Sequence, residues 1–282
     1  MKLFNRVTII GLGLIGGSLG LAIKKQRLAK EVVGVSRTRS TVVRALSMGA
    51  VDKVTLDTKK AVHGADFVIL CVPVLKIIDI AREISGSLEK GAIITDAGST
   101  KKEIVEKIEP LFPADVNFVG SHPLTGSERS GVIYSDQNLF KGAYCILTKT
   151  SRTKQAVLSK IKMFWHELGM KTEIMSPEKH DALISKLSHL PHAVSVSLSN
   201  ICAGQDLRLA AGGFKDTTRI ASSSPELWKD IFLTNRKNII RDIKELKKEL
   251  SKIEKALAEN NSPGILKLLK KAKLRRDSIK QY

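Results

Sequence analysis

Residues 7–23 read "VTIIGLGLIGGSLGLAI", and this stretch decides the fold prediction. A short β-branched run leads directly into three glycines, which open an apolar segment of helix length. The Gly-x-Gly-x-x-Gly spacing at a strand-to-helix junction is typical of dinucleotide binding. The first glycine makes the turn, the second lets backbone approach the pyrophosphate, and the third lets helix and strand pack closely. We therefore predict that a dinucleotide contacts the helix start, at Gly11, Gly13, Leu14, Ile15 and Gly16.

The same run, preceded by Lys2 and Arg6, resembles a secretory signal peptide. Its five glycines weaken a membrane helix, and no small-residue cleavage site follows, so we expect neither secretion nor membrane association. The cysteines Cys71, Cys145 and Cys202 are widely spaced and lack a Cys-x-x-Cys pattern. This argues against disulfides and structural zinc, and it indicates a reducing compartment, the cytoplasm.

Short apolar runs alternate with helix-length segments through the first two-thirds of the chain. Continuous apolar strands separated by helices indicate a mainly parallel sheet covered on both faces. The predicted strands are 7–11, 31–35, 67–72, 92–96, 117–121 and 143–148, with 171–175 as a further candidate. The predicted fold class is α/β, an N-terminal Rossmann-type doubly wound parallel sheet followed by an all-helical C-terminal domain.

The sequence changes character at Ser176-Pro177-Glu178. Serine as N-cap, proline at the first helical position and an acid in the first turn together mark a helix start. Only helical periodicity follows, so we place the domain boundary here, with a dinucleotide-binding domain at 1–175 and a helical domain at 176–282. A further helix is expected after Ser224, with Trp228 and Phe232 as core residues.

The chain carries a formal net charge of +19, and +9 of it lies in residues 236–282, which hold 15 Lys+Arg and 6 Asp+Glu. These residues also show an apolar rhythm from Ile239 to Leu257, so the charges form the solvated face of an amphipathic helix. No nucleic-acid-binding module or interleaved aromatic pattern is present, and we predict no nucleic-acid partner. The positive field favours acidic substrates. The order of the lysine-rich tail at 267–282 is left open.

The residues after the second predicted strand bear on the choice of cofactor. Where an acid would bind the ribose 2′-hydroxyl of NAD, the chain has Ser36, with Arg37 and Arg39 beside it. Arginines can bind a 2′-phosphate bidentately, which favours NADP over NAD, although both can also be ordinary surface residues. The strand end at Cys71, Val72 and Pro73 would reach the same ligand-binding edge.

Two later strand ends deliver polar side chains to that edge. Ser99 follows the strand at 92–96 in "TDAGSTKKE", and His122 follows the strand at 117–121 in "GSHPLTGSE". A lone histidine is more often structural than catalytic, but one placed beside a hydride acceptor is a candidate base.

Here the chain resembles the prephenate/arogenate dehydrogenases of tyrosine biosynthesis. The resemblance rests on "GLGLIGGS", "DAGSTK", "GSHPLTGSERSG", "SHLPH" and "FKDTTRIASSSPELWKDI", in order and spacing, and covers residues 7 to about 232. It implies hydride transfer from a small anionic substrate, prephenate or arogenate, to NAD(P), coupled to decarboxylation. It also implies a homodimer formed through the helical domain.

The resemblance further implies roles for individual residues. His122 is the catalytic base, Ser99 is its hydrogen-bond partner, and Glu128 lies at the mouth of the site. His189 and His192 face substrate and nicotinamide from one face of a helix. Arg219 holds a substrate carboxylate, with Asp216 one turn earlier to orient it.

Several alternatives remain open at this point. Glu128 can be a surface partner of Arg129, and Asp216 and Arg219 can form a surface ion pair. His189 and His192 can be structural or a metal pair, but no clear third ligand is present and we predict no metal. The whole chain can be another Rossmann-plus-helical dehydrogenase, of β-hydroxyacid or pyrroline type, or a non-catalytic dinucleotide sensor.

The sequence does not decide between prephenate and arogenate. We expect no chorismate mutase segment ahead of Met1 and no appended regulatory domain, so any tyrosine feedback would act at the active site itself.

Overall fold

A computed structural model describes residues 2–127, 129–202 and 204–279. The chain forms two compact units, residues 1–235 and residues 236–282, which are described separately. Glu128, expected at the mouth of the site, lies outside the described residues.

The first unit is built on a six-stranded sheet whose paired strands are all parallel. The order is β3-β2-β1-β4-β5-β6. Successive strands are added on one side of β1 up to β3 and on its other side from β4 onward, so the strand order switches between β1 and β4. Ligands bind outside the carboxyl ends of the strands at such a switch point. The strands are β1 Phe4–Ile10, β2 Ala29–Val35, β3 Lys53–Thr55, β4 Phe67–Leu70, β5 Ile93–Asp96 and β6 Asn117–Val119. The predicted Rossmann-type sheet is confirmed, and β3 is a strand that we did not predict.

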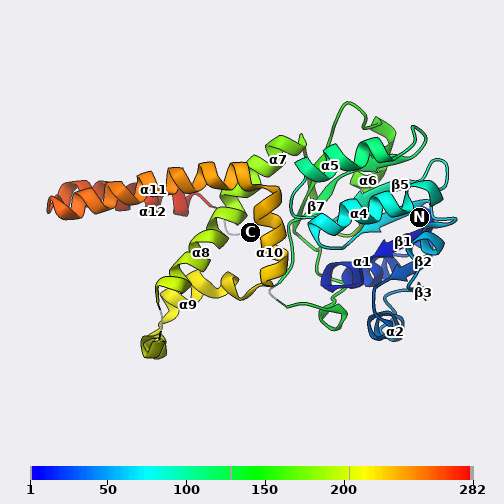
Figure 1. Cartoon of the computed structure of the whole chain (residues 1–282), viewed down its shortest axis with the longest axis horizontal. Helices are drawn as coiled ribbons and strands as arrows, with labels where there is room; N and C mark the ends of the chain where they lie inside the picture. The colour runs from blue at the N-terminus through cyan, green and yellow to red at the C-terminus, as the bar shows by residue number, and fades with distance from the viewer. Residues whose placement is uncertain (1, 128, 203, 280–282) are drawn as a thin grey trace. The chain divides into compact units, whose positions relative to one another are not determined.

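Helices cover both faces of this sheet (Figure 1). One apolar core joins Ile9 to α1, α2 and α6, and the other joins Ile10 to α3, α4 and α5. Neighbouring strand residues therefore point into different cores, as the pleat of a buried strand requires. The helices are α1 Leu14–Lys25, α2 Arg39–Ser47, α3 Thr58–Val62, α4 Val74–Ile84, α5 Lys102–Ile108 and α6 Gln155–Glu167. Short 3-10 turns lie at Ser85–Ser87, Glu109–Leu111 and Val132–Tyr134.

A second, three-stranded sheet corrects the strand prediction at 117–121. The chain leaves the large sheet at Gly120, and β7 Ser121–Pro123 pairs antiparallel with β8 Tyr144–Thr148, which pairs parallel with β9 Lys171–Met175. A Cβ on Gly120 would lie 2.5 Å from Thr148 Oγ1, so only glycine allows this close crossing. The candidate base His122 consequently lies within β7 of the small sheet rather than after a strand of the large one.

Helices and turns follow β9, as the sequence predicted. Ser176 caps α7, since its side chain accepts a hydrogen bond from Lys179 N at 3.2 Å, and Ser224 caps α10 in the same way. The helical elements of this unit are α7 Pro177–Ile184, a π-helix Ser185–His189, α8 Leu190–Ile201, α9 Gly212–Thr218 and α10 Pro225–Thr234, with 3-10 turns at Gly204–Leu209 and Arg219–Ser222.

The second unit is a hairpin of two helices, α11 Arg236–Ala258 and α12 Ser262–Asp277, which lie side by side (Figure 1). Asn261 caps α12 by accepting a hydrogen bond from Gly264 N at 2.9 Å. Much of the lysine-rich tail is therefore helical. Exposed leucines, such as Leu250 and Leu269, give the hairpin an apolar surface besides its charged one. In the described part of the chain, no helix combines the length and the hydropathy that a membrane crossing demands.

Candidate active site

The glycine turn between β1 and α1 has the shape that its sequence predicted. Gly11 has φ +102°, and a Cβ there would lie 2.3 Å from the carbonyl oxygen of Cys71. A Cβ on Gly16 would lie 1.9 Å from the carbonyl oxygen of Gly11, so these two glycines allow strand, turn and helix to touch. Around the Cβ position of Gly13, by contrast, no atom lies within 4 Å. The turn is closed toward the protein and open at Gly13, which fits the approach of a pyrophosphate.

The first turn of α1 offers backbone donors at this opening. Gly13 occupies the N-cap position and no side chain caps the helix, so the N–H groups that follow it, at Leu14 and Ile15, have no intrahelical acceptor. On the other side of the turn, Val72 Cγ1 lies 2.8 Å from where a Gly11 Cβ would be. Cys71 and Val72 thus form the opposite wall, with Pro73 as the N-cap residue of α4.

The residues that bear on cofactor choice lie at the carboxyl end of β2. Ser36 directly follows the strand and is half-buried, whereas Arg37 and Arg39 are exposed. Thr38 caps α2 by accepting a hydrogen bond from Thr41 N at 3.3 Å. Neither guanidinium forms an ion pair with another described residue, so both remain available to an anion at this end of the sheet.

A cavity of about 490 Å³ lies between β7, the π-helix and α10. Ser99, His122, His189 and Arg219 all line it, so four of the predicted site residues meet although 120 positions separate the first from the last. His192 and Asp216 do not line it. The remaining lining residues are Gly126, Ser127, Arg129, Ser130, Leu187, Ser188, Pro191, Ile220, Ser223, Ser224, Leu227, Trp228 and Ile231.

His122 is nearly buried, with 9% of its surface exposed, and contributes to the cavity wall. Its Nδ1 lies 2.8 Å from Nε2 of His180, which is wholly buried on α7. Burial lowers the pKa of His122 well below its usual value, and the nearby charge of Lys101 acts in the same direction. The imidazole is therefore neutral at pH 7, as a proton acceptor must be. Ser99 lines the cavity, but His180 takes the Nδ1 position; the Ser99 contact stays a prediction.

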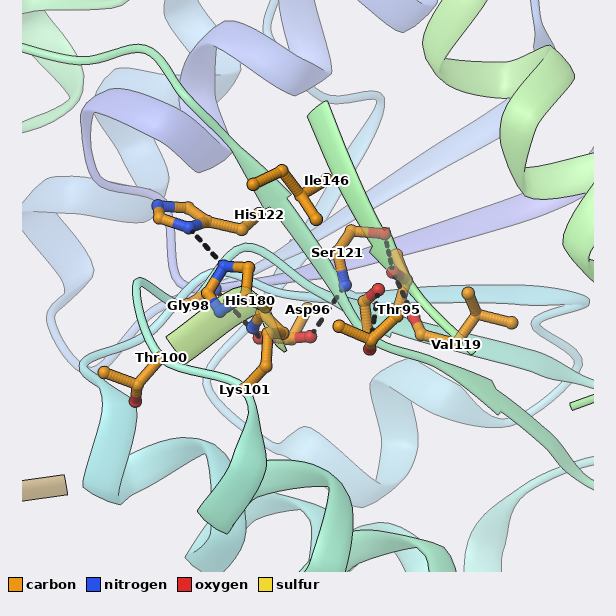
Figure 2. A network of polar contacts seen from close by, with 12 residues as sticks. Thr95, Asp96, Gly98, Thr100, Lys101, Val119, Ser121, His122, Ile146 and His180 are labelled. Atoms are coloured by element: carbon orange, nitrogen blue, oxygen red, sulfur yellow. Dashed lines mark hydrogen bonds and ion pairs between the residues drawn. The ribbon is translucent and has the colours of Figure 1, made fainter. Parts of the chain in front are cut away.

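A buried ion pair fixes the strand that carries His122 (Figure 2). The carboxylate of Asp96, at the end of β5, pairs with Lys101 Nζ, and neither side chain is exposed. The carboxylate also accepts hydrogen bonds from Gly98 N at 2.9 Å and from Ser121 N at 3.1 Å. Burial raises the pKa of Asp96, and Lys101 opposes that rise. Because Ser121 begins β7, this carboxylate ties the small sheet to the end of β5.

A chain of hydroxyl groups makes a second link between the sheets. Trp165 Nε1 donates to Ser121 Oγ at 3.1 Å, and Ser121 Oγ lies 2.6 Å from Thr95 Oγ1. Thr95 in turn donates to the carbonyl oxygen of Val119 at 2.7 Å. Figure 2 shows Ser121, Thr95 and Val119 of this buried chain, and because every donor in it has an acceptor, it holds the first residue of β7 in place.

His189 ends the π-helix and is almost wholly buried. Its Nδ1 lies 3.0 Å from the amide Nδ2 of Asn235, which also donates to the carbonyl oxygen of Asp181. An amide donor at Nδ1 places the hydrogen of the neutral ring on Nε2, and that buried nitrogen has no partner among the described residues. Burial lowers the pKa of His189 to about 4, so the ring is neutral and presents a donor.

His192 stacks on Trp228, with ring centroids 3.5 Å apart and an angle of 5° between the planes. His189 contacts the same indole edge-on at 5.9 Å, so both imidazoles reach one ring. Burial lowers the pKa of His192 to about 4. Our interpretation of Trp228 as a core residue holds only in part, because the half-buried residue packs against an apolar core and also lines the cavity. Phe232 is half-buried as well and packs edge-on against His192 at 5.9 Å.

Arg219 follows α9 and reaches the cavity, and its residue is exposed. Asp216 is exposed too, and no ion pair joins the two side chains in the ranges that the structure describes. Orientation of Arg219 by Asp216 therefore stays a prediction. Nowhere in those ranges are three His, Cys, Asp or Glu side chains grouped as metal ligands would be.

Sequence reasoning missed several residues of the site, namely Asp96, Lys101, His180, Asp181, Trp228 and Asn235. Asp96 and Lys101 stand in "TDAGSTKKE", in which only Ser99 attracted attention. An acid at a strand end followed by a lysine at the next helix start was the available signal. His180 and Asp181 offered no comparable signal, because their partners lie far away along the chain.

Two family models together match most of the chain. A family model described as prephenate dehydrogenase, nucleotide-binding domain, matches residues 19–174, and one described as prephenate dehydrogenase, dimerization domain, matches residues 176–271. The chain belongs to the prephenate dehydrogenase family. This membership agrees with the resemblance that the sequence motifs carried.

Individual members of the prephenate dehydrogenase family are similar to nearly the whole of this chain. The prephenate dehydrogenase of Bacillus subtilis is 36% identical over 98% of this chain and 76% of its own. The cyclohexadienyl dehydrogenase of Zymomonas mobilis is 33% identical over 99% of this chain and 98% of its own. A crystal structure of prephenate dehydrogenase from A. aeolicus, in complex with hydroxyphenyl propionate and NAD+, has a TM-score of 0.92 at 34% identity and covers 98% of both chains.

Proposed function

We propose that this protein catalyses the oxidative decarboxylation of prephenate or arogenate with a nicotinamide dinucleotide as hydride acceptor. The observation that carries the proposal is a neutral, buried imidazole, His122, in one cavity with the guanidinium of Arg219. A base and an anion-binding group in one cavity suit a substrate that is both an alcohol and a carboxylate. The family match and the solved relative with NAD+ support the same reaction.

In this reaction His122 accepts the proton of the ring hydroxyl. As that oxygen becomes a carbonyl, the C–H bond on the same carbon weakens, and its hydrogen leaves as hydride. The bound dinucleotide supplies the acceptor for this hydride. The ring carboxylate then leaves as CO2, and the ring becomes aromatic. A neutral His122 at pH 7 is ready for its part without prior deprotonation.

The other side chains of the cavity bind and orient the substrate. Arg219 offers a carboxylate two parallel hydrogen bonds, which a lysine cannot reproduce. His189 lines the same cavity, and we propose that its unpartnered Nε2–H donates to the substrate. Ser99 remains proposed as a hydrogen-bond partner of His122. His192, which stacks on Trp228, remains proposed to face the substrate and the nicotinamide. Glu128 remains the proposed carboxylate at the mouth of the site, and Asp216 remains proposed to orient Arg219.

The glycine turn would hold the pyrophosphate of the cofactor, because the space at Gly13 is open and the first N–H groups of α1 are uncapped. We propose NADP as the preferred dinucleotide. Ser36 replaces the acid that would repel a 2′-phosphate, and Arg37 and Arg39 lack ion-pair partners among the described residues. The NAD+ in the solved relative supports NAD as the alternative.

We further propose that residues 1–175 bind the dinucleotide and residues 176–282 complete the substrate site and form a homodimer. The match of 176–271 to a dimerization domain supports this division, as does the exposed apolar surface of α11 and α12. We also propose a reducing location, the cytoplasm, because the three cysteines are widely spaced in the sequence and lack a Cys-x-x-Cys pattern.

The experiment is an initial-rate assay at 340 nm that crosses prephenate and arogenate with NADP and NAD. We expect reduction with at least one pair, highest with NADP, and the preferred pair identifies both substrate and cofactor. Four flat traces from folded protein that still binds dinucleotide in a calorimeter would overturn the proposal and favour a dinucleotide-sensing protein.

A further inference from the structure

A second imidazole lies directly beneath the proposed base. His180, wholly buried on α7, has Nε2 2.8 Å from His122 Nδ1, with ring centroids 5.0 Å apart (Figure 2). The two residues are 58 positions apart, in the small sheet and in the helical segment. Burying two imidazoles in contact is costly unless their hydrogens are arranged to match, so the hydrogen positions in this pair are constrained.

Asp181 sets the hydrogen positions in this pair, because its carboxylate contacts the His180 nitrogen that faces away from His122. His180 Nδ1 lies 2.8 Å from Asp181 Oδ1. The same carboxylate accepts backbone hydrogen bonds from Lys101 N at 2.7 Å and Lys102 N at 3.0 Å, one on each oxygen. Burial raises the pKa of Asp181, and these two N–H groups oppose the rise. With donors on both oxygens, the ionised carboxylate is favoured, and it can only accept from His180.

The hydrogens of both rings then follow in sequence. His180 carries its hydrogen on Nδ1 to donate to Asp181, so its Nε2 is an acceptor. His122 must therefore carry its hydrogen on Nδ1, and its lone pair is on Nε2. Burial lowers the pKa of His180 to about 2, so this ring stays neutral and does not take up the proton itself.

We propose that His180 and Asp181 are positioning residues that hold His122 in the tautomer whose Nε2 is basic. This inference rests on the proposed function, in which His122 accepts the substrate proton. Nothing in the mechanism otherwise requires two further buried polar residues behind the base. Because an imidazole separates the carboxylate from His122, the base is oriented without being placed beside a full negative charge.

The direct test is nitrogen NMR of protein labelled with 15N-histidine, with His122→Asn used to assign the signal. We expect the His122 ring to be protonated on Nδ1 and free on Nε2 in the intact protein. In a His180→Leu variant, which removes the acceptor, the ring should shift toward hydrogen on Nε2. A His122 ring protonated on Nε2 in the intact protein would overturn the proposal, whatever the enzyme assay shows.

Kinetics provide the second test. We expect His180→Leu to lower kcat about 100-fold with KM within about twofold, and His180→Gln, whose amide oxygen can accept from Nδ1, to recover most of the loss. In the His122→Asn background, His180→Leu should have no further effect on kcat, since there is no base left to orient.

A matched control and the alternative outcomes keep this test independent of the proposed function. His166→Leu, on an exposed position of α6, should leave kcat unchanged. Full activity in His180→Leu, or equal losses in both His122 backgrounds, would overturn the positioning role. An intact protein inactive with every substrate and cofactor pair would instead overturn the proposed function, and the NMR result would still stand by itself.

Discussion

The glycine turn takes its shape mainly from six consecutive residues, 11–16, packed against Cys71 and Val72, whereas the cavity around His122 draws on elements from Ser99 to Ile231. The turn is made of backbone: its fit depends on which Cβ atoms are missing. The cavity is made of side chains whose hydrogens and charges are fixed by distant partners, such as His180 for His122. A local backbone site tolerates change outside its few residues, but an assembled site depends on every link behind it.

The largest expected effect is on catalysis in the cavity around His122. His122→Asn should lower kcat about 100- to 10,000-fold, because the side chain that accepts the proton is lost. Binding of dinucleotide, measured by titration calorimetry, should stay within about twofold, since the glycine turn is built separately. A kcat within tenfold of the intact enzyme would show that His122 is not the base.

Two glycine variants test the local side. Gly16→Ala places a methyl group 1.9 Å from Gly11 O and should lower the free energy of unfolding by about 3 kcal/mol. Gly13→Ala meets no protein atom and should cost under about 1 kcal/mol, yet weaken dinucleotide binding because the methyl group fills the open space. Urea unfolding without cofactor and calorimetry with it separate the two effects. Equal losses of stability would contradict this division of roles.

The buried histidines should make stability fall in mild acid. Burial lowers the pKa of His189 and His192 to about 4, while an unfolded histidine titrates near 6.5. Between these values the unfolded chain binds protons that the folded chain refuses, so stability is full above pH 6.5 and falls toward pH 4. At pH 5 His189 should cost about 2 kcal/mol and His192 less, measured by urea unfolding.

A variant and a control sharpen that measurement. His192→Phe keeps a flat ring against Trp228 but has nothing to titrate, so it should lose less stability between pH 7.5 and pH 5. His63→Gln, at an exposed position, should follow the intact protein. Parallel pH curves for His192→Phe and the intact protein would show that His192 is not held neutral.

The smallest expected effect is on cofactor choice. Replacing Arg37 and Arg39 together by glutamine should lower kcat/KM with NADP about tenfold, the loss expected for a charge-assisted hydrogen bond, and leave kcat/KM with NAD unchanged. Arg44→Gln, exposed in the last turn of α2, is the matched control. An equal loss with both dinucleotides would mean that these arginines do not read the 2′-phosphate.

The same contrast explains what the sequence could predict. The glycine turn, the parallel strands and the caps at Ser176 and Ser224 each depend on neighbouring residues, and the structure confirms them. The split of strand 117–121 escaped prediction, because it depends on how closely Gly120 approaches Thr148 from another sheet. Three residues of β3 carry too little pattern to be seen in a sequence.

The site divides along the same line. His122, Ser99, His189 and Arg219 were found through motifs, and the cavity brings these four together. Their supports were not found, because a buried contact such as Asp96 with Lys101, or Asn235 with His189, exists only once the chain has folded. Trp228 was assigned to the core because helical spacing does not tell a core ring from one that lines a cavity.

The stacking of His192 on Trp228 gives the molecule a built-in optical probe. The chain has two tryptophans: Trp165, buried and hydrogen-bonded to Ser121, and Trp228, in parallel contact with an imidazole. An imidazolium quenches indole emission where a neutral imidazole does not, so the brightness of Trp228 follows the charge of its neighbour. Among the described residues Trp165 has ring contacts with Phe140 and Phe164, and it responds to unfolding instead. A single emission spectrum, resolved with one Trp→Phe variant, thus follows proton uptake at the site separately from loss of the fold.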